Sequence, residues 1–187
     1  KVQNLTQATG QEFTELRTLA RRLGRDTAFS AQEAAEGMGF LGMAGFEVTQ
    51  IMKSMEPTLN LAAGSGMELG QTADIMSNIL TGYALDASEA ADVTDILTVT
   101  FQSANTNLEQ LGEAMSYVAP IASGLGIDIK ETSVAIGLLS NAGIQGARAG
   151  TNLRGALVAL AQPTSLAIKT LERLKIPRQN IFDAEGN

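Results

Sequence analysis

The sequence contains no cysteine, no histidine and no tryptophan, and only 4% of its 187 residues are aromatic. Without cysteine, the chain can form neither a disulfide framework nor a thiolate nucleophile. Because histidine is absent too, the usual general bases, nucleophiles and zinc ligands reduce to carboxylates, hydroxyls, lysine and tyrosine. The composition therefore predicts a protein that is not an enzyme, with no catalytic residue, no cofactor and no metal site.

Positive charge and long apolar runs are also scarce. The chain has 13 Lys and Arg residues against 20 Asp and Glu residues, so its formal net charge is −7. A protein that binds the phosphate backbone normally carries a basic face, and we therefore expect this chain to bind no nucleic acid. The longest uncharged run, 132–147, is shorter than the roughly 20 apolar residues of a spanning helix, so no membrane span is expected.

Helix signals recur along the whole sequence. Four small polar residues are each followed three positions later by Glu, which is the spacing of an N-terminal capping box: Ser30–Glu33, Asp86–Glu89, Thr106–Glu109 and Asp128–Glu131. Glycines mark expected helix ends at 24, 45, 64, 82, 124 and 143. These signals predict helices at 9–23, 30–44, 47–63, 68–81, 87–104, 107–123, 129–142, 147–161 and 164–175. No segment alternates with a period of two, so the expected fold is all-α, a compact bundle of about eight or nine short helices.

Two prolines and an internal alignment divide this bundle further. Pro57 and Pro120 fall inside expected helices, which should be kinked or split there. A shift of 60 places 61–69 over 121–129, and a shift of 56 places 33–36 over 89–92. The alignment indicates either two tandem helical units, at about 30–82 and 87–143, or the ease with which Ala-Gly-rich helices align with themselves.

Two groups of residues could carry chemistry, but each has a simpler interpretation. Asp92 and Asp95 are three apart on one expected helix and could hold a metal, although a solvated helix face explains them better. The segments 64–66 and 124–126 have the spacing Gly-x-Gly of phosphate loops. No strand precedes them and no Gly-Lys-Ser/Thr follows, so we interpret both as helix caps.

Two further groups could form a binding surface. The methionines Met38, Met43, Met52 and Met55 could grip a partner helix, although core filling is the preferred interpretation. Four arginines, Arg17, Arg21, Arg22 and Arg25, could face an acidic partner, although a solvated helix end is preferred.

The segment 149–164 is the most distinctive part of the chain. It opens with Ala-Gly-Thr-Asn-Leu-Arg, continues with an apolar stripe at Leu153, Leu157 and Leu160, and closes at Pro163. A helix that ends in Asn-Ala-Gly-Ile precedes it, so the two should form a helical hairpin with small residues where the helices approach. Arg154 could pair with a helix C-terminus or an acidic neighbour, in an architectural role.

This combination of motifs resembles the core region of the tape measure, or minor tail, proteins of long-tailed bacteriophages and prophages. The resemblance covers about 14–176 and extends through five further short motifs: Leu23-Gly24, Met43-Ala44-Gly45-Phe46, Leu80-Thr81-Gly82-Tyr83, Val118-Ala119-Pro120-Ile121-Ala122 and Leu125-Gly126. It implies a helical core domain at 1–176. The segment 177–187 lacks helical periodicity and is expected to be a linker. The chain also lacks an initiator methionine and a signal-peptide-like start, so we expect a piece of a longer protein.

The resemblance also implies a function. Tape measure proteins lie along the tail lumen during assembly, set tail length through the length of their chain, and leave the tube before or during genome delivery. The region resembled here lies outside the long helical segments credited with measuring. The implied partners are tube, tail initiator or tail chaperone proteins and further copies of the chain. The implied location is the virion tail, with the host cytoplasm during assembly.

Physical considerations favour a compact domain over a ruler. A ruler needs a long uninterrupted helix, whereas Gly and Pro interrupt this sequence at short intervals. We therefore expect an anchoring or self-association domain. A helical adaptor that binds one protein or peptide, and a membrane-active segment, are the competing hypotheses; the absence of Trp and of Lys-rich amphipathic faces counts against the second.

Overall fold

The computed structural model describes residue 6 and residues 8–174, which fold into helices without a strand. The elements are α2 (Gly10–Asp26), α3 (Ala31–Met43), α4 (Val48–Ser65), α5 (Leu69–Gly82), the 3-10 helix η1 (Ala87–Glu89), α6 (Ala90–Ser103), α7 (Leu108–Gly124), α8 (Ile129–Asn141), α9 (Gly146–Ala161) and α10 (Ser165–Arg173). The all-α prediction is confirmed, and each expected helix has its counterpart within a few residues. The expected linker at 177–187 lies outside the described residues, and the tandem duplication stays a prediction.

Local capping explains most helix starts. Ser30 and Asp86 form the predicted capping boxes with Glu33 and Glu89, and Asp128 accepts a hydrogen bond from the Glu131 backbone N–H at 2.7 Å. The box predicted at Thr106 is wrong. Helix α7 starts one residue later because Asn107 accepts the Gln110 backbone N–H at 2.9 Å and is the N-cap.

Glycine ends several helices, but not always at the expected position. Gly66 is the left-handed C-cap of α4, with φ of 69°, two residues beyond the predicted stop at 64. Helix α7 ends at Gly124 as predicted, and Gly126, with φ of 73°, follows it in a left-handed conformation. Gly24 does not end its helix, since α2 continues to Asp26. A Cβ atom at position 24 would overlap the Ala31 backbone nitrogen and lie 2.7 Å from Ala31 Cα. Gly24 therefore serves the close approach of the next segment.

The prolines do not split their helices. Pro57 lies inside α4 and Pro120 inside α7, and both helices continue past them. The Pro57 carbonyl accepts a hydrogen bond from Thr94 Oγ1 on α6 at 3.2 Å, so the proline-containing turn also contacts the neighbouring helix. Packing of this kind can hold a helix together where proline removes one of its backbone bonds.

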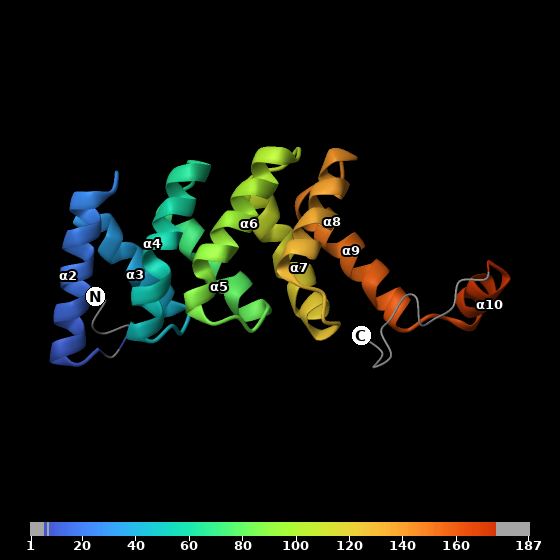
Figure 1. The fold of residues 1–187 in the computed structure, drawn as a ribbon, viewed down its shortest axis with the longest axis horizontal. Helices are drawn as coiled ribbons and strands as arrows, with labels where there is room; N and C mark the ends of the chain where they lie inside the picture. The colour runs from blue at the N-terminus through green and yellow to red at the C-terminus, as the bar shows by residue number, and fades with distance from the viewer. Residues whose placement is uncertain (1–5, 7, 175–187) are drawn as a thin grey trace.

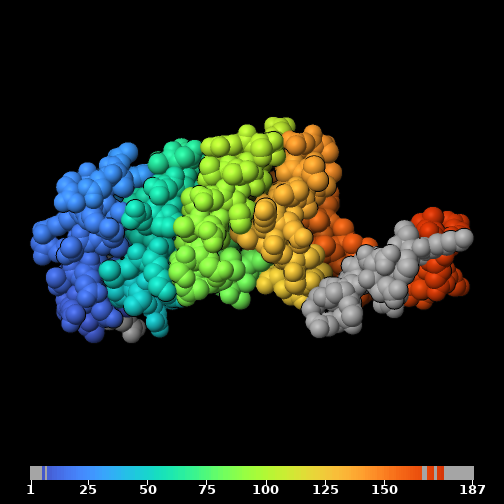
Figure 2. All heavy atoms as spheres, in the orientation of Figure 1, coloured from blue at the N-terminus to red at the C-terminus, as the bar shows by residue number. Residues whose placement is uncertain are grey.

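The helices stand side by side in a row (Figure 1). The larger contacts join each helix to the next one and to the next but one, from α2 through α9. The row therefore has two layers, with α3, α5, α7 and α9 in one and α2, α4, α6 and α8 in the other. This is the contact pattern of a solenoid, in which each unit packs only against its neighbours. Helix α10 lies apart from the row, at its far end (Figures 1 and 2).

The core lies between the two layers and is built mainly of Leu, Ile, Val, Ala and Met. Leu41, Ile51, Met55, Leu97 and Val118 are among its fully buried side chains. Among the described residues, none of the helices combines the length and the hydropathy that a bilayer crossing requires.

Candidate functional site

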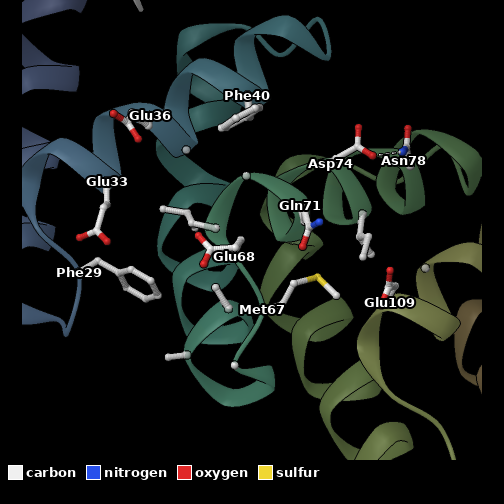
Figure 3. Close-up of a pocket in the computed structure, with 18 of the residues that line it drawn as sticks. Phe29, Glu33, Glu36, Phe40, Met67, Glu68, Gln71, Asp74, Asn78 and Glu109 are labelled. Carbon is white, nitrogen blue, oxygen red and sulfur yellow. Dashed lines mark hydrogen bonds between the residues drawn. The ribbon is translucent and has the colours of Figure 1, made fainter.

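A long hollow of about 1170 Å³ crosses three helices of one layer, and we call it the α3–α5–α7 groove (Figure 3). Each helix contributes residues at spacings of three and four, which place the side chains on one helix face. The contributing residues are Glu33, Glu36, Gly37 and Phe40 from α3, Gly70, Gln71, Asp74, Ile75 and Asn78 from α5, and Glu109, Gly112, Glu113 and Ser116 from α7. Phe29 and the end of α4 with Met67 and Glu68 close one side.

Glycines set the spacing of the helices beneath the groove. A Cβ atom at position 70 would lie 2.6 Å from Cε2 of Phe40, and a Cβ atom at position 112 would lie 2.6 Å from Cγ1 of Ile75. Each glycine therefore accepts the bulky side chain of the preceding helix in its layer. Phe40 remains 41% exposed, and it forms part of an apolar floor with the half-buried Phe29, Met67 and Ile75.

Carboxylates border this apolar floor. Six acidic residues line the groove, and all six are exposed: Glu33, Glu36, Glu68, Asp74, Glu109 and Glu113. Among the described residues that line it there is no Lys or Arg. The backbone N–H of Ser30, and then its hydroxyl, bond to the Glu33 carboxylate and hold the pKa of that group below its ordinary value. The groove is therefore apolar at its base and negatively charged at its edges.

A second hollow of about 750 Å³ lies beside the first, between α2 and α3. It shares Phe40 and Glu36 with the groove and adds Arg17, Arg21 and Met43. Arg17 and Arg21 are exposed, whereas Arg22 pairs with Glu56 at 3.4 Å and Arg25 with Asp26 at 2.7 Å. The arginine cluster is therefore an exposed helix face, as preferred from the sequence, and two of its four arginines are paired, Arg25 with its neighbour and Arg22 with a residue of α4.

The four methionines divide between core and surface. Met38 and Met55 are buried, as core filling predicts, whereas Met43 is 55% exposed and Met52 is 37% exposed. The preferred interpretation from the sequence is therefore right for two of the four and wrong for the other two.

The other candidate sites are dispersed. Asp92 and Asp95 lie exposed on α6, and Lys130 lines the same shallow hollow. In the described part of the chain, no three acidic side chains gather in a way that could hold a metal ion. The segment 64–66 forms the end of α4, where the Ser65 hydroxyl donates to the Leu61 carbonyl at 2.7 Å. The helix-cap interpretation of this Gly-x-Gly segment is confirmed.

The distinctive segment 149–164 forms most of α9. Its small residues make the close approach that the sequence predicts, but the partner is α7 rather than α8 of the expected hairpin. A Cβ atom at Gly150 would overlap the Ala114 carbonyl oxygen and lie 2.8 Å from Ala114 Cα. This contact is possible because every second helix lies in the same layer. A local sequence pattern carries no information about that arrangement.

The rest of α9 is less buried than its apolar stripe predicts. Leu153 and Leu157 are half-buried, and Leu160 is 44% exposed. Arg154 is exposed and forms none of the ion pairs found among the described residues, so its pairing stays a prediction. Among the described residues, no further helix of the row packs beyond α9, and its stripe stays partly open there.

Sequence reasoning missed the groove. Its signals were present as Glu-x-x-Glu-Gly at 33–37 and Glu-x-x-Gly-Glu at 109–113, in which glycine and carboxylates share one helix face. These patterns acquire meaning only when the alternate-layer arrangement brings the three helices together.

Comparison with known proteins identifies relatives of this chain. The family model described as phage-related minor tail protein matches residues 17–187. The chain is 40% identical over its full length to the tape measure protein of Pneumococcus phage Dp-1, of which it covers 16%. It is 31% identical, over 94% of its length, to the probable tape measure protein of Escherichia phage P2, of which it covers 21%. No solved structure matches the chain. The chain belongs to the phage-related minor tail protein family.

Proposed function

We propose that this segment is a compact anchoring domain of a tape measure chain. In this proposal it organises the chain during tail assembly through self-association or through contact with tube, tail initiator or tail chaperone proteins. It works in the host cytoplasm during assembly and in the virion tail afterwards, without catalysis. The measuring role belongs to another part of the tape measure protein.

The observation that carries the proposal is the folded row of short helices. The longest described helix, α4, has 18 residues, which corresponds to about 27 Å of helix. Each helix then turns back on the previous one, so adding residues to this segment lengthens the row by far less per residue than the rise of a straight helix. A segment with this packing suits attachment better than measurement.

One feature of the surface supports the proposal that the segment binds protein partners. The α3–α5–α7 groove combines an apolar floor with acidic edges, and exposed apolar hollows of this kind commonly mark interaction sites. The negative charge of the groove edges also repels the phosphate backbone of a genome that passes through the tail.

Electron microscopy of phage particles tests the proposal. The test compares the parent phage or prophage with a variant whose tape measure gene lacks the codons for residues 9–175 in frame. We expect loss of tails, because the rest of the tape measure chain would not be anchored. A phage that carries Gly155→Ala, at a position where a Cβ atom meets nothing within 4 Å, is the control and should form normal tails.

Two outcomes would contradict the proposal. Tails shortened in proportion to the deletion would indicate that the segment measures length. Tails of normal number and length would indicate that it has no role in assembly, and the adaptor hypothesis would then replace the anchoring one.

A further inference from the structure

We propose that the α3–α5–α7 groove binds the cationic helix α10 of a second copy of this chain. The inference rests on the self-association role proposed above and specifies its two surfaces. One copy supplies the acidic, apolar groove, and the other supplies an isolated amphipathic helix.

Helix α10 has the properties of a ligand for such a groove. It lies apart from the row of helices (Figure 1), and Leu174, next to its end, is 58% exposed. Lys169 and Arg173 are exposed on it. Against these two cations, α10 has the single acidic residue Glu172, although the chain as a whole has a net charge of −7. This segment therefore carries a net positive charge within a chain whose net charge is negative.

Size and charge are both compatible with this binding. A helix of nine residues, such as α10, is about 13 Å long and about 10 Å wide, so it occupies roughly 1,100 Å³. The groove measures about 1170 Å³. Ile168 and Leu174 would lie on Phe29, Phe40 and Met67, while Lys169 and Arg173 would meet the carboxylates at the edges. An amphipathic helix in an apolar groove is a common recognition mode, and opposite charges fix its orientation.

A second copy is a better source of the helix than the same chain. Gly150 of α9 lies against Ala114 of α7, beside the acidic end of the groove at Glu113. Ala161, the last residue of α9, is 11 residues further along the helix, or about 16 Å. Helix α10 then lies beyond the end of the row, away from the groove (Figure 1). A helix from another molecule has no such constraint.

Sedimentation of the purified full chain tests this inference. We expect concentration-dependent association that weakens at about 0.5 M salt, because salt screens the contacts between exposed charges. The double variant Lys169→Glu/Arg173→Glu should weaken association about tenfold or more, and so should Glu36→Lys/Glu109→Lys in the groove. Combining the two double variants should restore association, because each reversed charge again meets an opposite one. Asp92→Lys/Asp95→Lys, which makes the same charge change outside the groove, is the matched control and should associate like the original chain.

The measurement has several outcomes that overturn the inference. These are a chain that stays monomeric at every concentration, association that the α10 reversal leaves unchanged, and double variants whose combination restores nothing. A monomeric chain in which the groove variant lowers the hydrogen-exchange protection of α10 would place the helix in its own groove, which also overturns it. Circular dichroism checks that every variant keeps its helices. The sedimentation result does not depend on tails, so failure here is distinguishable from failure of the anchoring proposal.

Discussion

Two alanine substitutions in one helix should change stability in opposite directions. In a helix interior, Gly→Ala is favourable by about 1 kcal/mol. At Gly155 the added Cβ atom meets nothing within 4 Å, so Gly155→Ala should raise the stability of α9 by up to about 1 kcal/mol. At Gly150 the added atom overlaps the Ala114 carbonyl oxygen and lies 2.8 Å from Ala114 Cα and 2.9 Å from its carbonyl carbon. These are backbone atoms of α7, which cannot turn away as a flexible side chain can.

Helices α7 and α9 must therefore separate before Gly150→Ala can be accommodated. Overpacking of this kind typically costs about 1–3 kcal/mol, which exceeds the gain in helix propensity. Because both variants gain the same helix propensity, we expect their stabilities to differ by the overpacking cost alone, about 1–3 kcal/mol. Because α9 ends the row and can detach by itself, the assay is hydrogen exchange of the amides in 146–161, together with the urea midpoint measured by circular dichroism. The reasoning is refuted if Gly150→Ala protects α9 as well as the original glycine does.

Three further variants test single groups. The buried Ser140 hydroxyl has no hydrogen-bond partner among the described residues, so Ser140→Ala should raise the free energy of unfolding in urea by about 1 kcal/mol, and a loss would contradict this. Hydrogen bonds from the Ser88 hydroxyl and N–H, and from Lys53, lower the pKa of Asp86 from 3.8 to about 2. Their stabilisation is present above pH 4 and lost toward pH 2, so Asp86→Asn should lose less stability across that window in urea titrations. Burial raises the pKa of Tyr83 from 10.0 to about 12. Its contribution is full below pH 10 and lost as pH rises through 12, so Tyr83→Phe should unfold less in that window and lack the late phenolate absorbance step.

The helices were predictable because their signals are local. A capping box such as Ser30–Glu33 and a left-handed glycine such as Gly143 act within a few residues, so the sequence alone places the helix boundaries closely. The incorrect predictions of helix ends and breaks also concern single residues. At Gly24 and Pro57 a residue type that usually ends a helix is retained inside one, because a neighbouring segment packs against it. Tertiary packing overrides the local preference there.

The groove was not predictable by the same means. Its walls come from 33–40, 67–78 and 109–116, and consecutive walls meet only because each helix packs against the next but one. Glu33 was recognisable as a capping residue, and this role is confirmed, but its second role at the edge of a groove depends on α5. The same limit applies to Gly150, whose partner Ala114 is on α7.

The glycines beneath the groove connect its shape to the stability of the fold. Gly70 accepts Phe40, Gly112 accepts Ile75, and Gly150 accepts the backbone at Ala114, so successive helices of one layer are spaced by the same device. Enlarging Gly70 or Gly112 would displace a side chain of the groove and separate two helices at once. A binding defect in such a variant could not be assigned to the surface. Glu36 and Glu109 are exposed and are not capping-box residues as Glu33 is, and charge reversal at these two positions is therefore the perturbation that separates what the groove binds from what holds the helices together.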